Sequence, residues 1–369
     1  MKKKTIFFVT SSRSEYYLIK PLLKIIKKKN NFNLKIVVCG GHNDRSYGNT
    51  INAIIDDKFK FIKKIKNYSK RADLGTIEKS FLKLSEELIN IFRKEKKFIL
   101  LVLGDRYEAF CASNMANLMK MPIVHISGGD TSLGSNDEKY RNMISLISKL
   151  HFCKTEKHKK KLQNFKIKKD DIHVIGSLAL DNLKQISRKN YFKKYKSYCL
   201  ASVHSTKETI EKNLETVHLF ISLVKKLKKI NFIFTSASHD QFGIKINKIL
   251  LDASEKYKNC YFFHNLGGKK YLNAIQNSKF MIGNSSSGII ESSFFSKPSI
   301  SILPRQLGRQ ANRNVFFVEK SEKKILKILQ KIKLKNYKIV LKNNIFDMHK
   351  KVGSPSQYIY EKILKLKYE

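Results

Sequence analysis

The sequence predicts an α/β protein with two doubly wound domains, each built on a parallel sheet. The chain has 369 residues, 42% of them hydrophobic, so it is long enough to form two cores. In both halves, short apolar runs alternate with segments of helical periodicity. Such alternation is typical of parallel strands joined by right-handed helical crossovers. A polar, lysine-rich stretch at residues 181–196 separates the halves and is the best candidate for a linker.

The expected elements follow from these two periodicities. Apolar runs in the first half predict strands at residues 5–10, 34–39, 98–103, 123–126, 150–153 and 172–175. Helical periodicity predicts helices near residues 15–28, 76–94, 107–119, 138–148 and 155–164. The second half repeats this order, with strands expected at residues 198–203, 232–235, 261–263, 280–282 and 299–303.

These elements predict one Rossmann-like domain over residues 1–182 and a second over residues 183–352. A final helix near residues 356–367 follows a break at Gly353-Ser354-Pro355. We expect residues 353–369 to pack back toward the first domain.

The chain carries no sign of a membrane span or of an oxidising compartment. No run approaches 18 uncharged apolar residues. The lysine-rich N-terminus is followed by only about six apolar residues, too few for a signal peptide. The five cysteines are scattered without C-x-x-C spacing, which favours reduced, buried thiols in a cytoplasmic protein. We therefore expect a cytoplasmic protein with no membrane partner.

The formal net charge of +44 raises the alternative of a nucleic-acid-binding protein. The lysines are spread along the whole chain and greatly outnumber the arginines, which read nucleic-acid grooves better. A solvated basic surface is therefore the favoured interpretation, with no nucleic acid as partner. A basic field could also raise the encounter rate with a diphosphate substrate.

A serine-rich segment at residues 283–291 lies between an expected strand and an apolar run that we expect to be helical. Its hydroxyls and free N–H groups would stand at a helix N-terminus, where the helix dipole favours a phosphate. Arg305 and Arg309 follow the next expected strand, and their guanidiniums can hold phosphate oxygens. A capped helix with surface arginines is the alternative. Together the two features favour a nucleotide-phosphate site, in which Glu291 could accept the ribose hydroxyls.

Residue types used in catalysis follow the ends of many expected strands, where doubly wound domains place their ligands. They are His42, Asp105, His125, Asp130, Asp137, Glu138, Arg141 and His204. None of these histidines has a second Cys or His nearby at the spacing of a zinc site, so no metal is expected.

Each group also has a purely structural alternative. The pair Asp137-Glu138 could form only a helix N-terminal turn, with Arg141 as the i,i+4 partner of Asp137. Asp105 could cap the following helix. His125 and His204 could be hydrogen-bonded histidines near the core.

Taken together, these segments resemble the hydrolysing UDP-N-acetylglucosamine 2-epimerases, especially the branch that supplies N-acetylmannosamine or a related sugar for sialic-acid-like nonulosonates. The resemblance runs nearly from end to end. The matching segments are residues 12–16, 41–44, 47–50, 103–108, 122–130, Asp137-Glu138 with Arg141, 176–177, 181–182, 283–291 and 305–309.

The resemblance implies the fold of GT-B glycosyltransferases, in which two Rossmann-like domains flank a cleft and the C-terminal domain holds most of the nucleotide. The residues that it implies for the nucleotide are Arg13, Ser285, Ser286, Glu291, Arg305, Arg309 and Tyr271. The residues that it implies around the sugar and the breaking C1–O bond are Asp105, Asp137, Glu138, His125 and His204, with His42, Asp130 and Arg141 as further sugar contacts.

The reaction implied by the resemblance eliminates the nucleoside diphosphate across C1–C2 and gives a 2-acetamidoglycal, which is then hydrated with inversion at C2. It needs a base, an acid and cations near the leaving diphosphate, and no cofactor. The expected partner is a UDP-sugar, and a homodimer is left open. A GT-B glycosyltransferase is the nearest alternative enzyme.

Some positions depart from the family pattern, namely Ser127, Asp130, Asn142 and the segment after His204. They leave the substrate open between UDP-N-acetylglucosamine and two alternatives, a UDP-linked 2,4-diacetamido-2,4,6-trideoxyhexose and GDP-N-acetylglucosamine. Each alternative leads toward legionaminic acid.

Overall fold

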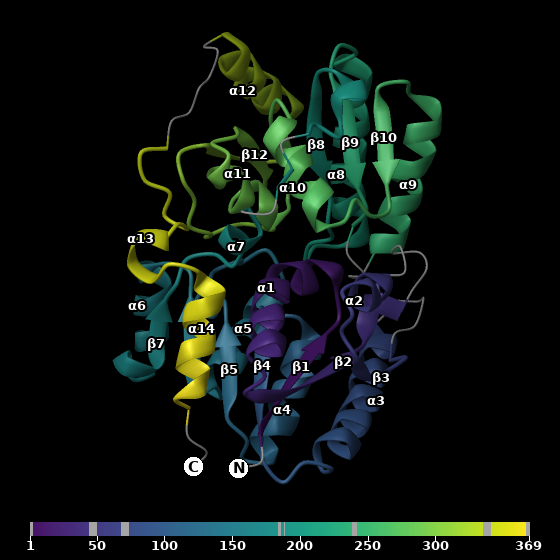
Figure 1. The fold of residues 1–369 in the computed structure, drawn as a ribbon. Coiled ribbons are helices and arrows are strands. Elements are labelled where there is room, and N and C mark those ends of the chain that lie inside the picture. Colours follow the sequence, from purple (N-terminus) through teal and green to yellow (C-terminus); the bar gives the residue numbers. More distant parts are fainter. Residues whose placement is uncertain are drawn as a thin grey trace. The chain divides into compact units, whose positions relative to one another are not determined.

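The computed structural model describes residues 3–43, 50–67, 74–183, 186–187, 189–237, 242–334 and 341–366 (Figure 1). The chain divides into two compact units. The first comprises Met1–Asp130, Asp137–Asn182 and Asp347–Glu369, and the second comprises Thr131–Asn136 and Leu183–Phe346. Within the described ranges, no helix combines the length and the hydropathy that a membrane span requires.

The first unit is built on a parallel sheet of seven strands in the order β3-β2-β1-β4-β5-β6-β7. The strands are β1 (Lys4–Thr10), β2 (Phe32–Val38), β3 (Phe61–Lys64), β4 (Phe98–Leu103), β5 (Ile123–Ile126), β6 (Leu150–Cys153) and β7 (Ile172–Val174). The chain starts at the centre, runs outward to β3, and returns to continue from β4 in the other direction. This is a doubly wound sheet, and its topological switch point lies between β1 and β4.

Helices cover both faces of this sheet (Figure 1). The helices of this unit are α1 (Arg13–Lys29), α2 (Asn52–Asp56), α3 (Leu74–Phe92), α4 (Tyr107–Leu118), α5 (Asp137–Leu146), α6 (Glu156–Asn164), α7 (Ala179–Leu183), α13 (His349–Val352) and α14 (Pro355–Leu364). Successive side chains of β1 point to opposite faces of the sheet and enter two different cores. Ile6 and Phe8 join the core under α1 and α14, whereas Phe7 and Val9 join the core under α3 and α4.

The first helix shows how local sequence sets an element. Ser12 caps α1, and Glu15 completes a capping box by reaching back to the Ser12 backbone. The apolar face of the helix is fully buried against the sheet. Lysines occupy the last turn, where the negative end of the helix dipole stabilises their charge. Asn30 ends the helix in a left-handed conformation.

The C-terminal helix α14 belongs to the first unit. Its residues Ile359, Tyr360 and Ile363 are buried in the same core as α1. The backbone N–H of Ser356 donates to Asp181 Oδ2 at 2.8 Å, and Lys4 Nζ donates to the Leu366 carbonyl at 2.8 Å. These contacts tie the end of the chain to its beginning.

The second unit is built on a parallel sheet of six strands in the order β10-β9-β8-β11-β12-β13. The strands are β8 (Tyr198–Ser202), β9 (Asn231–Thr235), β10 (Cys260–Phe263), β11 (Met281–Gly283), β12 (Ser299–Ile302) and β13 (Val315–Val318). The helices are α8 (Ile210–Lys226), α9 (Gly243–Lys256), α10 (Gly268–Asn277), α11 (Glu291–Phe294) and α12 (Glu322–Leu334). The sheet is again doubly wound, with its switch point between β8 and β11.

The expected fold class is confirmed, because both units are doubly wound parallel α/β structures. Every expected strand is present, with ends shifted by no more than two residues. Two of the four edge strands, β3 and β13, were not expected. The stretch at 181–196 differs from a solvated linker, because Phe192 and Tyr195 are buried in the core of the second unit.

The helix expected after the serine-rich segment is much shorter than predicted. The structure has a 3-10 turn at Ser286–Gly288, followed by the four-residue helix α11. So short a helix has only a small dipole, because the dipole grows from aligned peptide groups. Any anion at this segment must therefore depend mainly on hydroxyls, individual N–H groups and the nearby arginines.

Candidate active site

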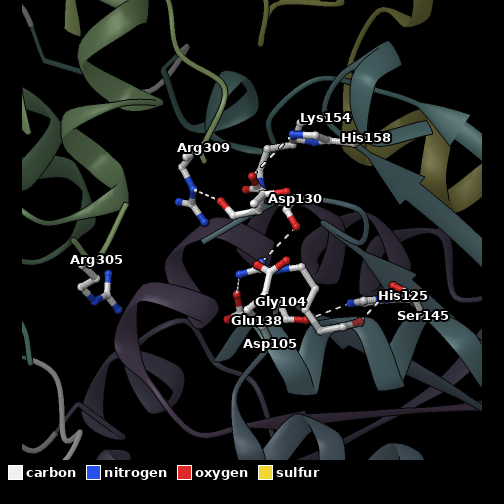
Figure 2. A network of polar contacts seen from close by, with 12 residues as sticks. Gly104, Asp105, His125, Asp130, Glu138, Ser145, Lys154, His158, Arg305 and Arg309 are labelled. Carbon is white, nitrogen blue, oxygen red and sulfur yellow. Dashed lines mark hydrogen bonds and ion pairs between the residues drawn. The ribbon is translucent and has the colours of Figure 1, made fainter. Parts of the chain in front are cut away.

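The first unit gathers three of the expected carboxylates around one buried arginine, Arg141 of α5. Its guanidinium donates to Asp105 Oδ2, to Glu138 Oε2 at 2.7 Å and to the backbone carbonyl of Asp130 at 3.1 Å (Figure 2). Arg141 is only 2% exposed. Burial alone would lower its pKa, but the carboxylates of Asp105, Asp130 and Glu138 together hold the pKa above the ordinary value. Arg141 therefore stays charged and arranges the acidic groups around it.

The positions of these groups follow from the sheet. Asp105 comes directly after β4, beside the switch point, and Gly104 supplies the positive φ that turns the chain there. Glu138 lies in the first turn of α5, where a carboxylate is favoured by the helix dipole. Asp137 begins the same helix and is half-buried. The structure pairs Arg141 with Glu138 at i,i+3 and with Asp105 across elements.

Asp130 is held from the side of α6. Its Oδ2 lies 3.0 Å from Lys154 Nζ, and its Oδ1 lies 3.4 Å from His158 Nε2 (Figure 2). Lys161, one turn further along α6, donates to the Asp130 carbonyl at 3.1 Å and to Glu138 Oε1 at 2.6 Å. Two basic side chains, Arg141 and Lys161, thus meet on the same carboxylate of Glu138.

The two histidines of the first unit are placed in the core. His125 is fully buried on β5, with Nε2 2.8 Å from the Gly104 carbonyl and Nδ1 3.1 Å from Ser145 Oγ (Figure 2). Burial lowers the pKa of His125 to about 3, so the ring is neutral at pH 7. His42 is also fully buried, with its ring nitrogens 3.0 Å and 2.9 Å from threonine hydroxyls. This geometry matches the structural alternative for His125, which supports the Gly104 turn next to Asp105.

Arg13 is the first residue of α1, directly after the capping residue Ser12, and is half-buried. Its neighbour Glu15 accepts N–H groups of Ser11 and Ser12 at 2.9 and 3.0 Å. Burial raises the pKa of Glu15 to about 7 despite these hydrogen bonds. The capping box thus holds Arg13 at the end of β1, beside the switch point of its own sheet.

In the second unit, the switch point is organised by Asn284. Its side chain accepts the N–H of His204 at 2.7 Å and donates to the His204 carbonyl at 2.6 Å. Its own carbonyl accepts from Gln306 Nε2 at 2.7 Å and from Arg305 at 3.4 Å. The loops after β8, β11 and β12 are therefore joined through one buried residue. Gly283, just before it, has φ +148°, and an added Cβ would lie 2.0 Å from the Ser202 carbonyl oxygen.

The expected phosphate residues lie along these loops. Ser285 caps the 3-10 turn by accepting the N–H of Ser287, and Ser286 begins that turn. Glu291 is the first residue of α11 and is 7% exposed. Arg305 follows β12 and shares the Asn284 carbonyl with Gln306. Arg305 and Ser285 are thus brought to the same edge of the sheet.

The segment 131–136 is a short excursion of the chain into the second unit. The N–H of Leu133 donates to the Leu307 carbonyl at 3.0 Å, and Arg309 Nε donates to the Thr131 carbonyl at 3.3 Å (Figure 2). Gly134 lies against the backbone of Pro304, where an added Cβ would be 2.0 Å from the carbonyl oxygen. Arg309 therefore has a structural role in holding this segment.

Tyr271 lies on α10 and is partly buried against the core beside β10. Parts of the matching segments lie outside the part of the chain that the structure describes, namely Asp44, Tyr47, Gly48 and Asn49. Within the described ranges, no three His, Cys, Asp or Glu side chains form a group suited to a metal ion.

Four residues of these networks were not anticipated from sequence: Lys154, His158, Lys161 and Asn284. The three basic residues lie in a run that is rich in lysine, where nothing singles out one side chain. Their spacing at i, i+4 and i+7 does predict one helical face, which was the available signal. Asn284 stood inside the serine-rich segment, but its contacts are 80 residues away in sequence.

Comparison with known proteins identifies the family of this chain. A family model described as UDP-N-acetylglucosamine 2-epimerase matches residues 24–352. The GDP/UDP-N,N'-diacetylbacillosamine 2-epimerase (hydrolyzing) of Campylobacter jejuni is 33% identical over 324 residues, which cover 85% of this chain and 84% of that protein. The polysialic acid biosynthesis protein P7 of Escherichia coli is 30% identical over 323 residues, which cover 85% of this chain and 82% of that protein.

Solved structures share the fold at lower identity. The Staphylococcus aureus MnaA–UDP co-structure superposes with a TM-score of 0.80 at 17% identity, covering 99% of this chain and 98% of that chain. The UDP-GlcNAc 2-epimerase from Neisseria meningitidis bound to UDP-GlcNAc superposes with a TM-score of 0.78 at 18% identity, covering 98% of this chain and 100% of that one. The chain therefore has a GT-B-like fold with two Rossmann-like units.

Proposed function

Because this chain belongs to the UDP-N-acetylglucosamine 2-epimerase family, we propose that it is a hydrolysing 2-epimerase of a nucleoside-diphosphate 2-acetamido sugar. The observation that carries the proposal is the Arg141 cluster, in which the carboxylates of Asp105, after β4, and Glu138, in α5, are held by one buried guanidinium. Carboxylates held in this way can serve as acid and base on a sugar carbon.

The proposed reaction has two stages. In the first, a carboxylate removes the proton from C2 while the C1–O bond to the diphosphate breaks, so that a C1=C2 double bond forms. In the second, water adds its oxygen to C1 and a proton is delivered to the opposite face of C2. The products are the free 2-epimeric sugar and the nucleoside diphosphate, and atoms and charges balance without any redox step.

Each unit supplies a distinct part of this chemistry. In the first unit, Asp105, Asp137 and Glu138 are the candidate acid and base groups, and Arg141 fixes Asp105 and Glu138. In the second unit, the serines after β11 and Arg305 after β12 would hold the diphosphate, whose negative charge grows as it leaves. Asn284 keeps those two loops together.

We propose a UDP-linked 2,4-diacetamido-2,4,6-trideoxyhexose as the preferred sugar nucleotide. Two relatives support this choice by name, the Campylobacter jejuni protein and the UDP-N,N'-diacetylbacillosamine 2-epimerase (hydrolyzing) of Legionella pneumophila, which is 28% identical over 325 residues. UDP-N-acetylglucosamine is the second candidate. A UDP-N-acetylglucosamine 2-epimerase of Neisseria meningitidis is 27% identical over 344 residues and supports it.

The test incubates the purified chain with each UDP-sugar, and with the GDP-linked forms, in deuterated water. The expected result is release of nucleoside diphosphate and a free 2-epimeric sugar that carries deuterium at C2, with the highest kcat/KM for the diacetamido sugar. A higher kcat/KM for UDP-N-acetylglucosamine would reverse the substrate assignment. Failure to release any nucleoside diphosphate, or release without deuterium at C2, would refute the epimerase chemistry itself.

A further inference from the structure

One face of α6 carries basic side chains that the proposed reaction does not itself require. Lys154 precedes the helix, and His158 and Lys161 follow at helical spacing on the same side. All three reach Asp130 or Glu138. The remaining lysines of this helix include Lys160, which is exposed. Both faces of α6 carry lysines, but the basic side chains on one face contact the carboxylates, whereas Lys160 on the other face is exposed to solvent.

Lys161 is the residue of this face that contacts both Asp130 and Glu138. Its ammonium group donates to Glu138 Oε1 at 2.6 Å, while Arg141 donates to Glu138 Oε2 at 2.7 Å. The same two cations also share the carbonyl of Asp130, each at 3.1 Å. Glu138 is therefore held at both oxygens, by Arg141 of its own helix α5 and by Lys161 of α6. A carboxylate held at a single oxygen could rotate about its last torsion, whereas this one cannot do so without breaking a charged hydrogen bond.

These contacts also secure both ends of the 131–136 excursion. Asp130 is the last residue before the excursion, and Asp137 with Glu138 begin α5 directly after it. Lys161 contacts the residue before the excursion and the second residue after it. Its side chain is 25% exposed, whereas Glu138 is 12% and Arg141 is 2% exposed. The Lys161–Glu138 pair is thus more shielded from water than an ordinary surface ion pair, which contributes little to stability.

We propose that Lys161 is a positioning residue for the epimerisation: it holds the Glu138 carboxylate and the start of α5, with Asp137, in the geometry that the chemical step needs. This inference rests on the proposed function. Lys161 touches none of the reacting atoms in this scheme and acts through Glu138. Loss of the ammonium group should therefore slow the chemical step without weakening the hold on the nucleotide, because Asp130 and Glu138, which Lys161 holds, are not among the expected nucleotide ligands, which apart from Arg13 lie in the second unit.

The test compares Lys161→Met with Lys160→Ala, a lysine-to-apolar change on the exposed side of the same helix. We expect Lys161→Met to lower kcat roughly 10- to 100-fold, as small misplacements of catalytic groups do. The Kd for UDP and the Tm should stay close to those of the unaltered protein, and the acidic limb of the kcat–pH profile should move. Lys160→Ala should leave kcat unchanged.

Chemical rescue separates a positioning role from a merely structural one. Lys161→Cys, treated with 2-bromoethylamine, regains an ammonium group at almost the native length. The five native cysteines are buried, so the introduced thiol is the accessible one. Recovery of most of the lost kcat is the expected result, with the alkylated unaltered protein as control.

Three outcomes would overturn the inference: kcat of Lys161→Met equal to that of Lys160→Ala, a parallel fall in kcat, UDP affinity and Tm, or no recovery on alkylation. All three leave the unaltered enzyme active, so the proposed function would stand. An unaltered protein without turnover on any sugar nucleotide would instead refute the proposed function, and this inference with it.

Discussion

Asn284 and His204 exchange two hydrogen bonds, one from the His204 N–H to Asn284 Oδ1 at 2.7 Å and one from Asn284 Nδ2 to the His204 carbonyl at 2.6 Å. The pair joins the loops that follow β8 and β11, the two strands at the switch point of the second sheet. Asn284 is 2% exposed, so neither bond is replaced by water when the amide is lost.

We expect Asn284→Ala to destabilise the second unit by about 2–3 kcal/mol, because the partly buried N–H and carbonyl of His204 both lose their bonds to the Asn284 amide. UDP binding should weaken as well, since the loops that carry Ser285 and His204 lose their common support. Thermal unfolding and calorimetric titration with UDP measure the two effects. Asn277→Ala is the matched control: it removes one hydrogen bond, from the Asn277 side chain to the Asn273 carbonyl on α10, and should reduce stability much less. Equal losses in the two variants would contradict the role given to Asn284.

Arg305→Ala should weaken UDP binding by roughly 2–3 kcal/mol, about 30- to 150-fold, if its guanidinium makes a charged hydrogen bond to the diphosphate. The measurement is a UDP titration of the folded variant. Arg313→Ala, an exposed arginine of the same unit, should bind UDP normally. Unchanged UDP affinity in Arg305→Ala would remove this residue from the proposed phosphate site.

Asp137→Asn should abolish turnover and leave UDP affinity nearly unchanged. The substitution keeps the shape of the side chain but removes its ability to accept a proton, and Asp137 lies in the first unit, whereas the expected diphosphate ligands Ser285, Ser286 and Arg305 lie in the second. Single-turnover release of UDP and an equilibrium titration separate the two effects. A variant that still turns over at the normal rate would exclude Asp137 as acid or base.

Gly134→Ala should displace the 131–136 segment from the loop after β12. An added Cβ would lie 2.0 Å from the Pro304 carbonyl oxygen and 2.7 Å from the Arg305 Cα, and both are backbone atoms that cannot rotate aside. We expect weaker UDP binding together with lower kcat, because the segment also leads into Asp137. Leu133→Ala, which shortens an exposed neighbour, is the control. Normal kinetics in Gly134→Ala would show that the segment tolerates displacement.

The burial of His151 predicts that the protein loses stability as the pH falls below about 6.5. It is fully buried on β6, and burial lowers its pKa from 6.5 to about 4. The unfolded chain therefore binds more protons between these two values, so the contribution of His151 is complete above about pH 6.5 and is lost as the pH falls toward 4. At pH 5 the loss is roughly 2 kcal/mol.

His151→Gln keeps a donor for the Ser148 carbonyl but does not titrate in this range. The expected result is a smaller fall in Tm between pH 7 and pH 5 than in the unaltered protein. Comparison of the two proteins cancels groups of opposite sign, such as Glu15, whose pKa is raised to about 7. Identical pH dependence in both proteins would contradict the burial of a neutral His151.

The sequence predicted the interior of each sheet well because interior strands are buried on both faces. The fully buried run Phe98–Leu103 shows this pattern. The edge strand Phe61–Lys64 has mostly exposed side chains, so no burial pattern marked it. The edge strand Val315–Val318 was also missed, although strands as short as Ile123–Ile126 were predicted. Three of its four side chains are half-buried or exposed, so it lacks the full burial of an interior strand.

For the candidate site, the sequence determined which residue types end up at the ends of central strands, because strand order and chain direction follow from the alternation of elements. Asp105, His204, Ser285 and Arg305 were all expected there on that ground. What only the tertiary structure decided is how such residues are paired and how deeply they are buried. The bonds of Arg141 to Asp105 and of Lys161 to Glu138 span 36 and 23 residues of chain, and the burial of His125 depends on neighbouring elements. Local patterns report the burial of a segment, whereas pairing depends on distances that exist only once the chain has folded.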